Sequence, residues 1–211
     1  MNAGQAYLLI VEDDPDILEL LDTTLTFGGY RVITARNGRE GLEVIKKQLP
    51  AIVIADIMMP MLDGFGLVHR LRINRETRDI PVVFITATYV APEDKEFALN
   101  IGVTRFIEKP INLEDFLTTI AELLKRGVPV AIEPLKELSF YEGYRKRLEK
   151  KLDQKNKQIA REEDLLKTSL GEENEALRAS LHQAISDRDE IKLLLVQIRE
   201  QLGKSTKPEQ E

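Results

Sequence analysis

The sequence of 211 residues contains no cysteine and no tryptophan. The lack of cysteine excludes a scaffold held together by disulfide bonds. No apolar run approaches the roughly 20 residues that a helix needs to cross a bilayer. The N-terminus also lacks a basic flank followed by a long apolar stretch, so no signal peptide is expected. These absences predict a cytoplasmic protein without a membrane partner.

Positive charge is not in excess either. The formal net charge of −6 at pH 7 argues against general binding to nucleic acid. The composition changes near residue 126. Residues 1–126 hold most of the glycines and β-branched runs, whereas residues 127–211 are rich in Leu, Glu, Lys, Arg and Gln. The first segment is long enough to bury its own core, and the second predicts one or two long helices.

Strand-like and helix-like segments alternate along residues 1–126. Short apolar, β-branched runs predict strands, and apolar residues spaced three or four apart predict helices between them. Asp14 followed by Pro15 is typical of a helix start. The predicted strands are 7–11, 30–35, 51–55, 81–85 and 105–108. Five consecutive β-α units predict an α/β fold with a doubly wound, five-stranded parallel sheet.

Polar residues stand at the carboxyl ends of four predicted strands, the edge of an open α/β sheet where ligands bind. These ends carry the residues Glu12-Asp13-Asp14, Asp56, Thr86 and Lys109. Carboxylates brought close together repel one another unless one takes up a proton or a cation neutralises them. A small hard cation such as Mg²⁺ prefers oxygen ligands. Glu12, Asp13 and Asp56 therefore predict a divalent-metal site.

The same strand ends suit phosphoryl transfer. A carboxylate such as Asp56 can act as a nucleophile and form an acyl phosphate. The phosphoryl oxygens then need fixed counter-charges, because this chemistry depends on positioning and electrostatics. Lys109 supplies an ammonium group and Thr86 a hydroxyl, while the small Ala87 leaves room for an attacking water.

Four motifs give residues 7–126 a resemblance to the receiver domain of two-component response regulators. They are Val11-Glu12-Asp13-Asp14, Asp56-x-Met58-Met59-Pro60-x-x-Asp63-Gly64, Ile85-Thr86-Ala87 and Phe106-Ile107-Glu108-Lys109-Pro110. Each motif alone is weak, but all four in order at these spacings are strongly specific. The resemblance implies a flavodoxin-like sheet with strand order 2-1-3-4-5, like that of chemotaxis receivers.

The resemblance also implies roles for individual residues. Asp56 is the phosphoacceptor, and a cognate histidine kinase or phosphotransfer protein is the donor. Asp13 and Asp56 bind Mg²⁺ by their side chains and Met58 binds it by its main-chain carbonyl. Glu12 takes the second acid-pocket position, from which it reaches the metal through water.

Two further family features map onto this sequence. Thr86 and Phe106 match the switch pair, in which the hydroxyl moves toward the phosphoryl group and the ring rotates inward. The peptide bond between Lys109 and Pro110 matches one that is usually cis.

Three positions depart from the common receiver pattern. Thr104-Arg105 stands where many transcription-factor receivers have acidic residues that form dimer salt bridges, which argues against that dimer here. Phe106 lacks the hydroxyl of the commoner tyrosine, so the switch would work by packing alone. Val103 follows Gly102 where a small residue is usual, a difference to which we assign no consequence.

The second half of the chain predicts a linker, a coiled coil and a tail. Two prolines and a glycine predict an extended linker over 127–137. Heptad-like apolar spacing then runs from 138 to 203, with a phase break near 169–172, and 204–211 form a flexible tail. The region is one long coiled coil with a skip or two helices hinged near Gly171. The heptads favour a parallel homodimer, and Asn174 at a core position would fix its register; the alternative is a helical hairpin.

A basic stretch within this region, residues 145–157, offers DNA contact as an alternative. Its positive residues are interspersed with Glu149 and Asp153, and the polar base-reading residues of basic zippers are missing. A solvated face of a coiled coil is the better interpretation, so nucleic acid is not an expected partner.

Together these features predict a cytoplasmic response regulator of phosphorelay signal transduction. Asp56 would accept the phosphoryl group, and a dimerising coiled coil would act on an unknown downstream protein. The chain would not be an enzyme beyond Mg²⁺-dependent self-phosphotransfer and dephosphorylation. One alternative is a phosphatase with an aspartyl-phosphate intermediate, although Met58 stands where a second acid is wanted. The other is a dimerisation scaffold with a silent receiver.

Overall fold

The computed structural model describes residues 6–86, 92–126, 135–168 and 173–205. The chain divides into two compact units, Met1–Leu135 and Lys136–Glu211. Among the described residues, no helix is long and apolar enough to cross a membrane.

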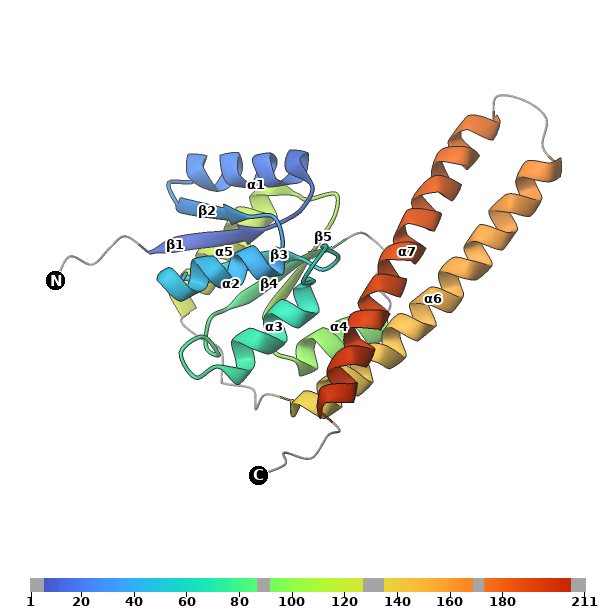
Figure 1. Ribbon diagram of the computed structural model, residues 1–211. Helices are drawn as coiled ribbons and strands as arrows, with labels where there is room; N and C mark the ends of the chain where they lie inside the picture. The colour runs from blue at the N-terminus through green and yellow to red at the C-terminus, as the bar shows by residue number, and fades with distance from the viewer. Residues whose placement is uncertain (1–5, 87–91, 127–134, 169–172, 206–211) are drawn as a thin grey trace. The chain divides into compact units, whose positions relative to one another are not determined.

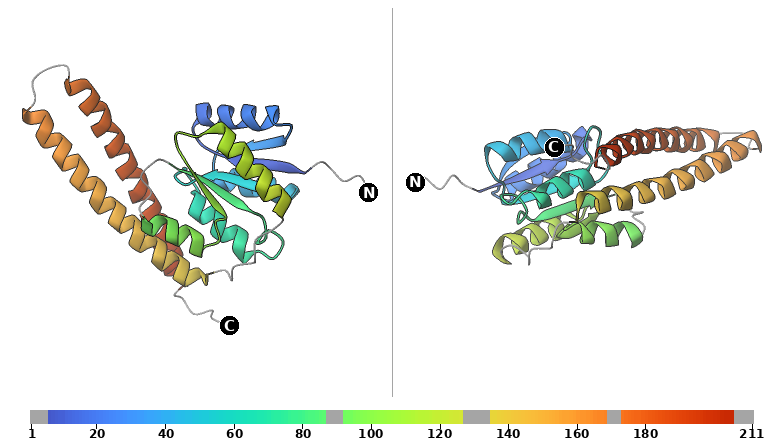
Figure 2. Two further views of the ribbon diagram at one scale, coloured as in Figure 1. Left: turned by 180° about the vertical axis from the view of Figure 1, so that it is seen from behind. Right: turned by 60° about the horizontal axis from the view of Figure 1, so that its bottom comes forward.

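The first unit is a five-stranded parallel sheet with helices on both faces (Figures 1 and 2). Its strands are β1 (Tyr7–Val11), β2 (Arg31–Ala35), β3 (Ile52–Asp56), β4 (Val82–Thr86) and β5 (Arg105–Glu108). Its helices are α1 (Pro15–Phe27), α2 (Gly38–Lys47), α3 (Gly64–Ile73), α4 (Pro92–Asn100) and α5 (Leu113–Arg126). The strand order is β2-β1-β3-β4-β5, so the predicted fold class is confirmed.

The three central strands are buried on both faces. Every residue of β1 and β4 is buried, and β3 is buried up to Asp56, which is half-buried. Strands covered by helices on both sides cannot alternate polar and apolar residues, which explains their continuous apolar sequences. One of the two faces packs against α1 and α5 through Leu21, Leu25, Phe116, Ile120 and Leu123. This core holds the carboxyl ends of the strands in place.

Side-chain caps start the helices that follow these strand ends. Asp14 accepts hydrogen bonds from the backbone N–H groups of Asp16 and Ile17, and Pro15 occupies the first helical position of α1. Asn37 caps α2, and Asp63 caps α3 by accepting from Gly66 N–H at 2.8 Å. Each cap satisfies backbone donors that would otherwise be unpaired. The loops between strands and helices are thereby fixed close to the sheet edge.

Arg72 is a buried arginine in the last turn of α3, with a relative exposure of 6%. Its guanidinium donates to the carbonyl of Gly102 through Nε at 3.2 Å and Nη2 at 2.7 Å, and to the carbonyl of Ile80 through Nη1 at 3.0 Å. Burial lowers the pKa of Arg72 to about 10, so the side chain stays charged at neutral pH. Gly102 has a φ of 98°, and a Cβ there would lie 2.6 Å from Arg72 Nε. Arg72 therefore ties the end of α3 to the turns before β4 and β5.

We expect Arg72→Met to lower the free energy of unfolding by about 1–3 kcal/mol, because the carbonyls of Ile80 and Gly102 lose their donor. Arg75→Met is the matched control, since Arg75 is exposed and its side chain makes no hydrogen bond or ion pair with the described residues. Urea unfolding of both variants measures the difference. Equal midpoints for the two variants would show that the buried guanidinium contributes nothing.

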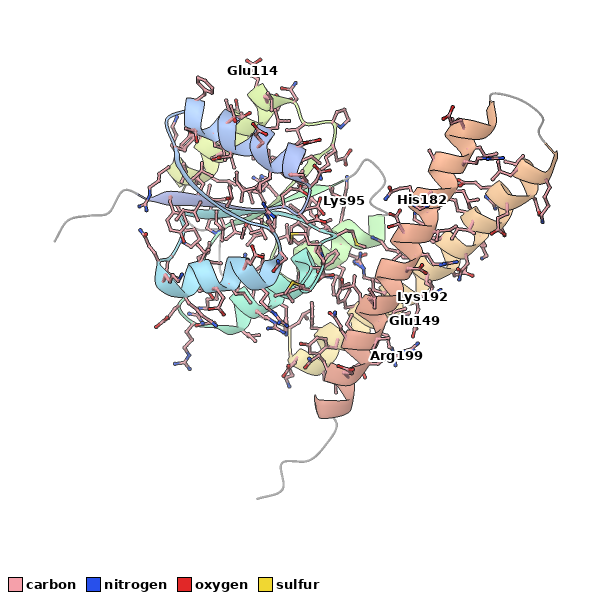
Figure 3. All side chains as sticks on the ribbon, turned by 45° about the horizontal axis from the view of Figure 1, so that its top comes forward. Lys95, Glu114, Glu149, His182, Lys192 and Arg199 are labelled. Atoms are coloured by element: carbon pink, nitrogen blue, oxygen red, sulfur yellow. The ribbon has the colours of Figure 1, made fainter. Side chains whose placement is uncertain are left out.

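The second unit is an antiparallel helical hairpin of α6 (Glu137–Thr168) and α7 (Glu173–Ser205). Glu149 Oε1 lies 3.6 Å from Arg199 Nη2, and Figure 3 labels both residues on their helices. Helix α6 starts one residue before the predicted helical region, and α7 ends two residues beyond it. The predicted linker and tail lie mostly outside the described residues. This single chain has the hairpin arrangement, and the homodimer stays a prediction.

Candidate functional site

The site lies at the carboxyl ends of β1, β3, β4 and β5. In the parallel register Val11 pairs with Ala55 and Thr86 with Glu108. Glu12, the next residue after β1, is therefore level with Asp56, and Lys109, the next after β5, lies just beyond Thr86. The strand order brings these ends to one edge of the sheet, as the sequence predicts.

Three carboxylates form a compact cluster at this edge. Glu12, Asp13 and Asp56 each offer one oxygen, and these atoms all lie within 4.8 Å of one another. Glu12 is buried at 2% relative exposure, Asp56 is half-buried and Asp13 is exposed. An all-oxygen donor set open to solvent on one side fits a hard cation that keeps some of its water, as Mg²⁺ does. The residues present thus fit the predicted metal.

Lys109 reaches into the same cluster. Its Nζ donates to Asp56 Oδ1 at 2.9 Å and to Glu12 Oε2 at 3.1 Å. The positive charge of this ammonium group offsets part of the repulsion between the two neighbouring carboxylates. The sequence places Lys109 as a partner for phosphoryl oxygens, but it does not reveal that the lysine bridges these two acids.

The pKa values follow from burial and these contacts. Burial raises the pKa of Glu12 to about 7, with a further rise from Asp56 and a partial offset from Lys109. Burial also raises the pKa of Asp56 and of Asp13. Burial alone would lower the pKa of Lys109, but the charges of Asp56 and Glu12 and the hydrogen bonds to them raise it above its usual value. The Glu12 carboxyl is therefore partly protonated near neutral pH, where a cation can displace its proton.

We expect Mg²⁺ affinity to rise with pH up to about 7 and then level off, because Glu12 must lose its proton before the cation binds. The rise should approach about tenfold per pH unit below that point, the effect of releasing one proton. Calorimetric titration with Mg²⁺ between about pH 5 and about pH 8 measures it. Glu12→Gln should flatten the profile. A wild-type affinity that is independent of pH would contradict the role of Glu12.

The loop after β3 holds the Asp56 side chain in place, and it leaves no room for a side chain at position 64. Met58 N–H donates to Asp56 Oδ2 at 2.6 Å, and Gly64 N–H donates to the carbonyl of Ile57 at 2.9 Å. A Cβ on Gly64 would lie 2.5 Å from the carbonyl oxygen of Asp56. Met61 adopts a φ of 67°, which a non-glycine residue rarely does. Met58, whose main-chain carbonyl is a predicted metal ligand, belongs to this loop and is bonded to Asp56 through its N–H.

The predicted switch residues lie on β4 and β5. Thr86 is buried at the end of β4, and its carbonyl accepts a hydrogen bond from Lys109 N–H at 2.8 Å. Phe106 is half-buried on β5 and packs edge-to-face on Phe84, with 5.9 Å between ring centroids. The Lys109–Pro110 peptide bond is cis. Ala87 lies outside the described residues.

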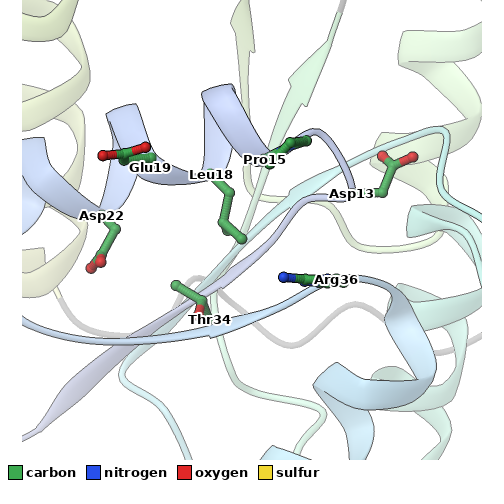
Figure 4. A pocket seen from close by; sticks show the side chains of 7 residues that line it. All are labelled: Asp13, Pro15, Leu18, Glu19, Asp22, Thr34 and Arg36. Carbon is green, nitrogen blue, oxygen red and sulfur yellow. The ribbon is translucent and has the colours of Figure 1, made fainter.

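A groove beside Asp13 contains residues that the sequence does not single out (Figure 4). Its lining consists of Asp13, Pro15, Leu18, Glu19, Asp22, Thr34 and Arg36. Arg36 follows β2, which lies next to β1 in the sheet, so the strand order could have placed it beside Asp13. Composition and spacing alone carry no signal for it, because a lone arginine after a strand is a common surface residue.

The first unit of the chain is similar in sequence to known proteins. Residues 8–121 match the model of the response regulator receiver domain. The chain belongs to this family. A probable transcriptional regulator from Pyropia yezoensis, ycf27, is 38% identical over 127 residues, covering 60% of this chain and 51% of the relative. The response regulator SaeR of Staphylococcus aureus is 32% identical over 136 residues, 64% of this chain and 58% of SaeR.

Solved receiver structures resemble the first unit. A putative response regulator from Chloroflexus aurantiacus has a TM-score of 0.55 and 31% identity, covering 58% of this chain and all of its own. The Vibrio cholerae chemotaxis protein CheY4 has a TM-score of 0.53 and 32% identity, covering 56% of this chain and 98% of its own. The chain spans only about half the length of the curated relatives it matches. These proteins thus share the receiver domain with this chain. The helical hairpin lies outside residues 8–121, which match the family model.

Proposed function

We propose that this chain is a two-component response regulator whose receiver takes a phosphoryl group on Asp56 from a histidine kinase or a phosphotransfer protein. The observation that carries the proposal is the group formed by Glu12, Asp13, Asp56 and Lys109 at one edge of the sheet. A metal site and a fixed cation beside one half-buried carboxylate are what phosphoryl transfer to a carboxylate requires.

The chemical step is a displacement at phosphorus. An oxygen of the Asp56 carboxylate forms the new P–O bond, the P–N bond of the phosphohistidine breaks, and the imidazole leaves with a proton from solvent. Asp13, Asp56 and the Met58 carbonyl would hold Mg²⁺, with Glu12 acting through water, and the bound cation would supply positive charge to the phosphoryl oxygens. Lys109, which pairs with the Asp56 carboxylate before the reaction, turns to a phosphoryl oxygen after it.

The response would pass through β4 and β5. The hydroxyl of Thr86 moves toward the phosphoryl group, and the half-buried ring of Phe106 turns into the space that this movement opens. Phe106 has no hydroxyl to bond at either position, so packing alone favours one state or the other. An ion pair between Lys95 of α4 and Glu108 of β5 links the two elements of this face. This face would report the phosphorylated state.

The output is proposed to be a protein–protein interaction of α6 and α7. Acidic and basic residues are interspersed along the hairpin, a pattern that is typical of a solvated helix surface. A homodimer through these helices, a cytoplasmic location and the absence of turnover beyond self-phosphotransfer and dephosphorylation belong to the same proposal. The proposed downstream partner is a protein that binds the surface of α6 and α7.

Binding of beryllofluoride in the presence of Mg²⁺ tests the proposal, since this complex mimics an aspartyl phosphate. We expect the wild-type chain to bind it and Asp56→Asn to bind none, as measured by calorimetry. Asp79→Asn is the matched control, because Asp79 is exposed and lies before the amino end of β4. No binding by the wild type, or equal binding by Asp56→Asn, would leave a scaffold with a silent receiver as the better account.

A further inference from the structure

The hairpin of the second unit buries the same helix face that the heptads predict as a dimer seam. Along α6 and α7, predicted seam residues from Leu148 onward are buried or half-buried wherever their side chains are described. They are Leu148, Leu152, Lys155, Ile159, Glu162, Leu166, Leu177, Leu181, Ala184, Arg188, Ile191, Leu195, Ile198 and Leu202. The same seam can therefore be used for the hairpin within one chain or for a dimer between two chains, but not for both at once.

Two of the polar contacts across the hairpin pair residues that are equally far from Gly171 along the sequence. Lys155 Nζ lies 2.8 Å from Asp187 Oδ2, and both side chains are about half-buried. Ser180 Oγ donates to Glu162 Oε1 at 3.1 Å. Gly171 is the midpoint in sequence of both pairs. These two pairs have the register of helices that run antiparallel to each other.

A parallel homodimer would place like charges together at the same positions. Lys155 is a seam residue and would face Lys155 of the partner subunit. Like charges at a half-buried seam position repel, whereas the antiparallel arrangement places Lys155 Nζ 2.8 Å from Asp187 Oδ2. This contact therefore favours antiparallel pairing over the parallel orientation that the heptads suggest.

We propose that the chain dimerises by exchanging these helices with a second copy of itself. In the dimer, α6 of one copy packs on α7 of the other, and each contact across the hairpin re-forms between chains. The two-fold axis passes near Gly171, and α6 and α7 of each chain become one helix of roughly 100 Å. Exchange of identical elements is a low-cost route to a dimer, because no new contact surface is needed. The inference rests on the proposed helical output but not on phosphorylation of Asp56, so the two can fail separately.

The four residues between α6 and α7, Ser169-Leu170-Gly171-Glu172, lie outside the described residues. Gly171 is the one with a very low helix propensity, so substitutions there test the proposal. Gly171→Ala should favour a continuous helix in both chains and raise the dimer association constant about tenfold. Gly171→Pro should keep the chain monomeric, because proline breaks a continuous helix. Light scattering on the full-length variants over a range of concentrations measures both effects.

Cross-linking between chains tests the pairing directly. Because the natural sequence has no cysteine, only the introduced cysteines can react. Glu149→Cys and Arg199→Cys are suitable positions, because their side chains are 45% and 63% exposed and lie opposite each other across the hairpin. The two full-length single variants are mixed, left to exchange and treated with a short bismaleimide. We expect a product of two chains from the mixture. Leu193→Cys in place of Arg199→Cys is the control, since Leu193 is 65% exposed and should give little product.

The cross-linked products and the oligomeric state distinguish helix exchange from parallel pairing and from a monomeric hairpin. A mixed Glu149→Cys and Arg199→Cys product that increases with Gly171→Ala supports helix exchange. A product from Glu149→Cys alone that exceeds the mixed product would show parallel pairing and overturn the proposal. A chain that stays monomeric at all concentrations, with and without Gly171→Ala, would also overturn it, since the hairpin would then be the only arrangement.

Discussion

Asp56→Asn is expected to abolish phosphoryl uptake by the full chain while leaving the fold intact. The amide keeps the shape of the side chain but cannot act as the nucleophile, and it removes one of the three carboxylates that would bind the metal. Incubation with acetyl phosphate and Mg²⁺, followed by the intact mass of the protein, measures uptake. The wild type should gain one phosphoryl group and the variant none.

Two controls make this result specific to Asp56. Asp79→Asn, which makes the same chemical change before the amino end of β4, should be phosphorylated like the wild type. Thermal unfolding of Asp56→Asn should show a midpoint no lower than that of the wild type, because removing one of two neighbouring buried acids relieves their repulsion. Phosphoryl uptake by Asp56→Asn equal to that of the wild type would place the acceptor elsewhere in the chain.

Gly64→Ala is expected to have the second-largest effect, on both stability and the site. A Cβ at this position would lie 2.5 Å from the carbonyl oxygen of Asp56, 3.0 Å from Ile57 Cα and 3.1 Å from Phe84 Cε1. Two of these neighbours are backbone atoms that cannot move without shifting the loop that holds Asp56. Overpacking of this kind costs about 1–3 kcal/mol of the free energy of unfolding. Displacement of Asp56 should also weaken Mg²⁺ binding at temperatures where the variant is folded.

Gly203→Ala is the matched control, because a Cβ there meets no atom within 4 Å and lies within α7. It should be neutral or slightly stabilising, as alanine is in a helix. Urea unfolding and Mg²⁺ calorimetry on both variants separate a local effect at the site from a general effect of added methyl groups. If Gly64→Ala unfolds and binds Mg²⁺ like the wild type, the loop is less constrained than its geometry indicates.

The fold and the acid cluster could be predicted because local and global signals agree. Buried parallel strands need continuous apolar runs, so β1, β3 and β4 are visible in the sequence. The end of β3 is marked by Asp56, and parallel strands bring their carboxyl ends to one edge. Glu12 and Asp56 could therefore be placed together before any coordinates were known.

Other features depend on tertiary packing that the sequence does not display. Arg72 occurs in a helix with one other arginine, Arg70, and an exposed position is the normal expectation for both. Its burial follows from the left-handed turn at Gly102 and the carbonyls that accept its hydrogen bonds. The bridge from Lys109 to Glu12 depends on the exact approach of two strand ends, which spacing alone does not give.

The helical half shows a different kind of ambiguity. An apolar seam packs equally well within one chain or between two chains, so the heptads cannot distinguish a hairpin from a dimer. The pairing of Lys155 with Asp187 carries the missing information, because it fixes which residues face each other. In the proposed antiparallel dimer the starts of the two α6 helices would lie far apart, so phosphorylation would have to act along the helices.

Locating the phosphoryl group by peptide mapping tests the central claim most directly. The full chain is treated with acetyl phosphate and Mg²⁺, reduced with borohydride to trap the acyl phosphate, digested and sequenced by mass spectrometry. The account predicts one modified residue, Asp56, and no modification when Mg²⁺ is removed by a chelator. An unmodified Asp56 in a chain that is folded and saturated with Mg²⁺ would contradict it.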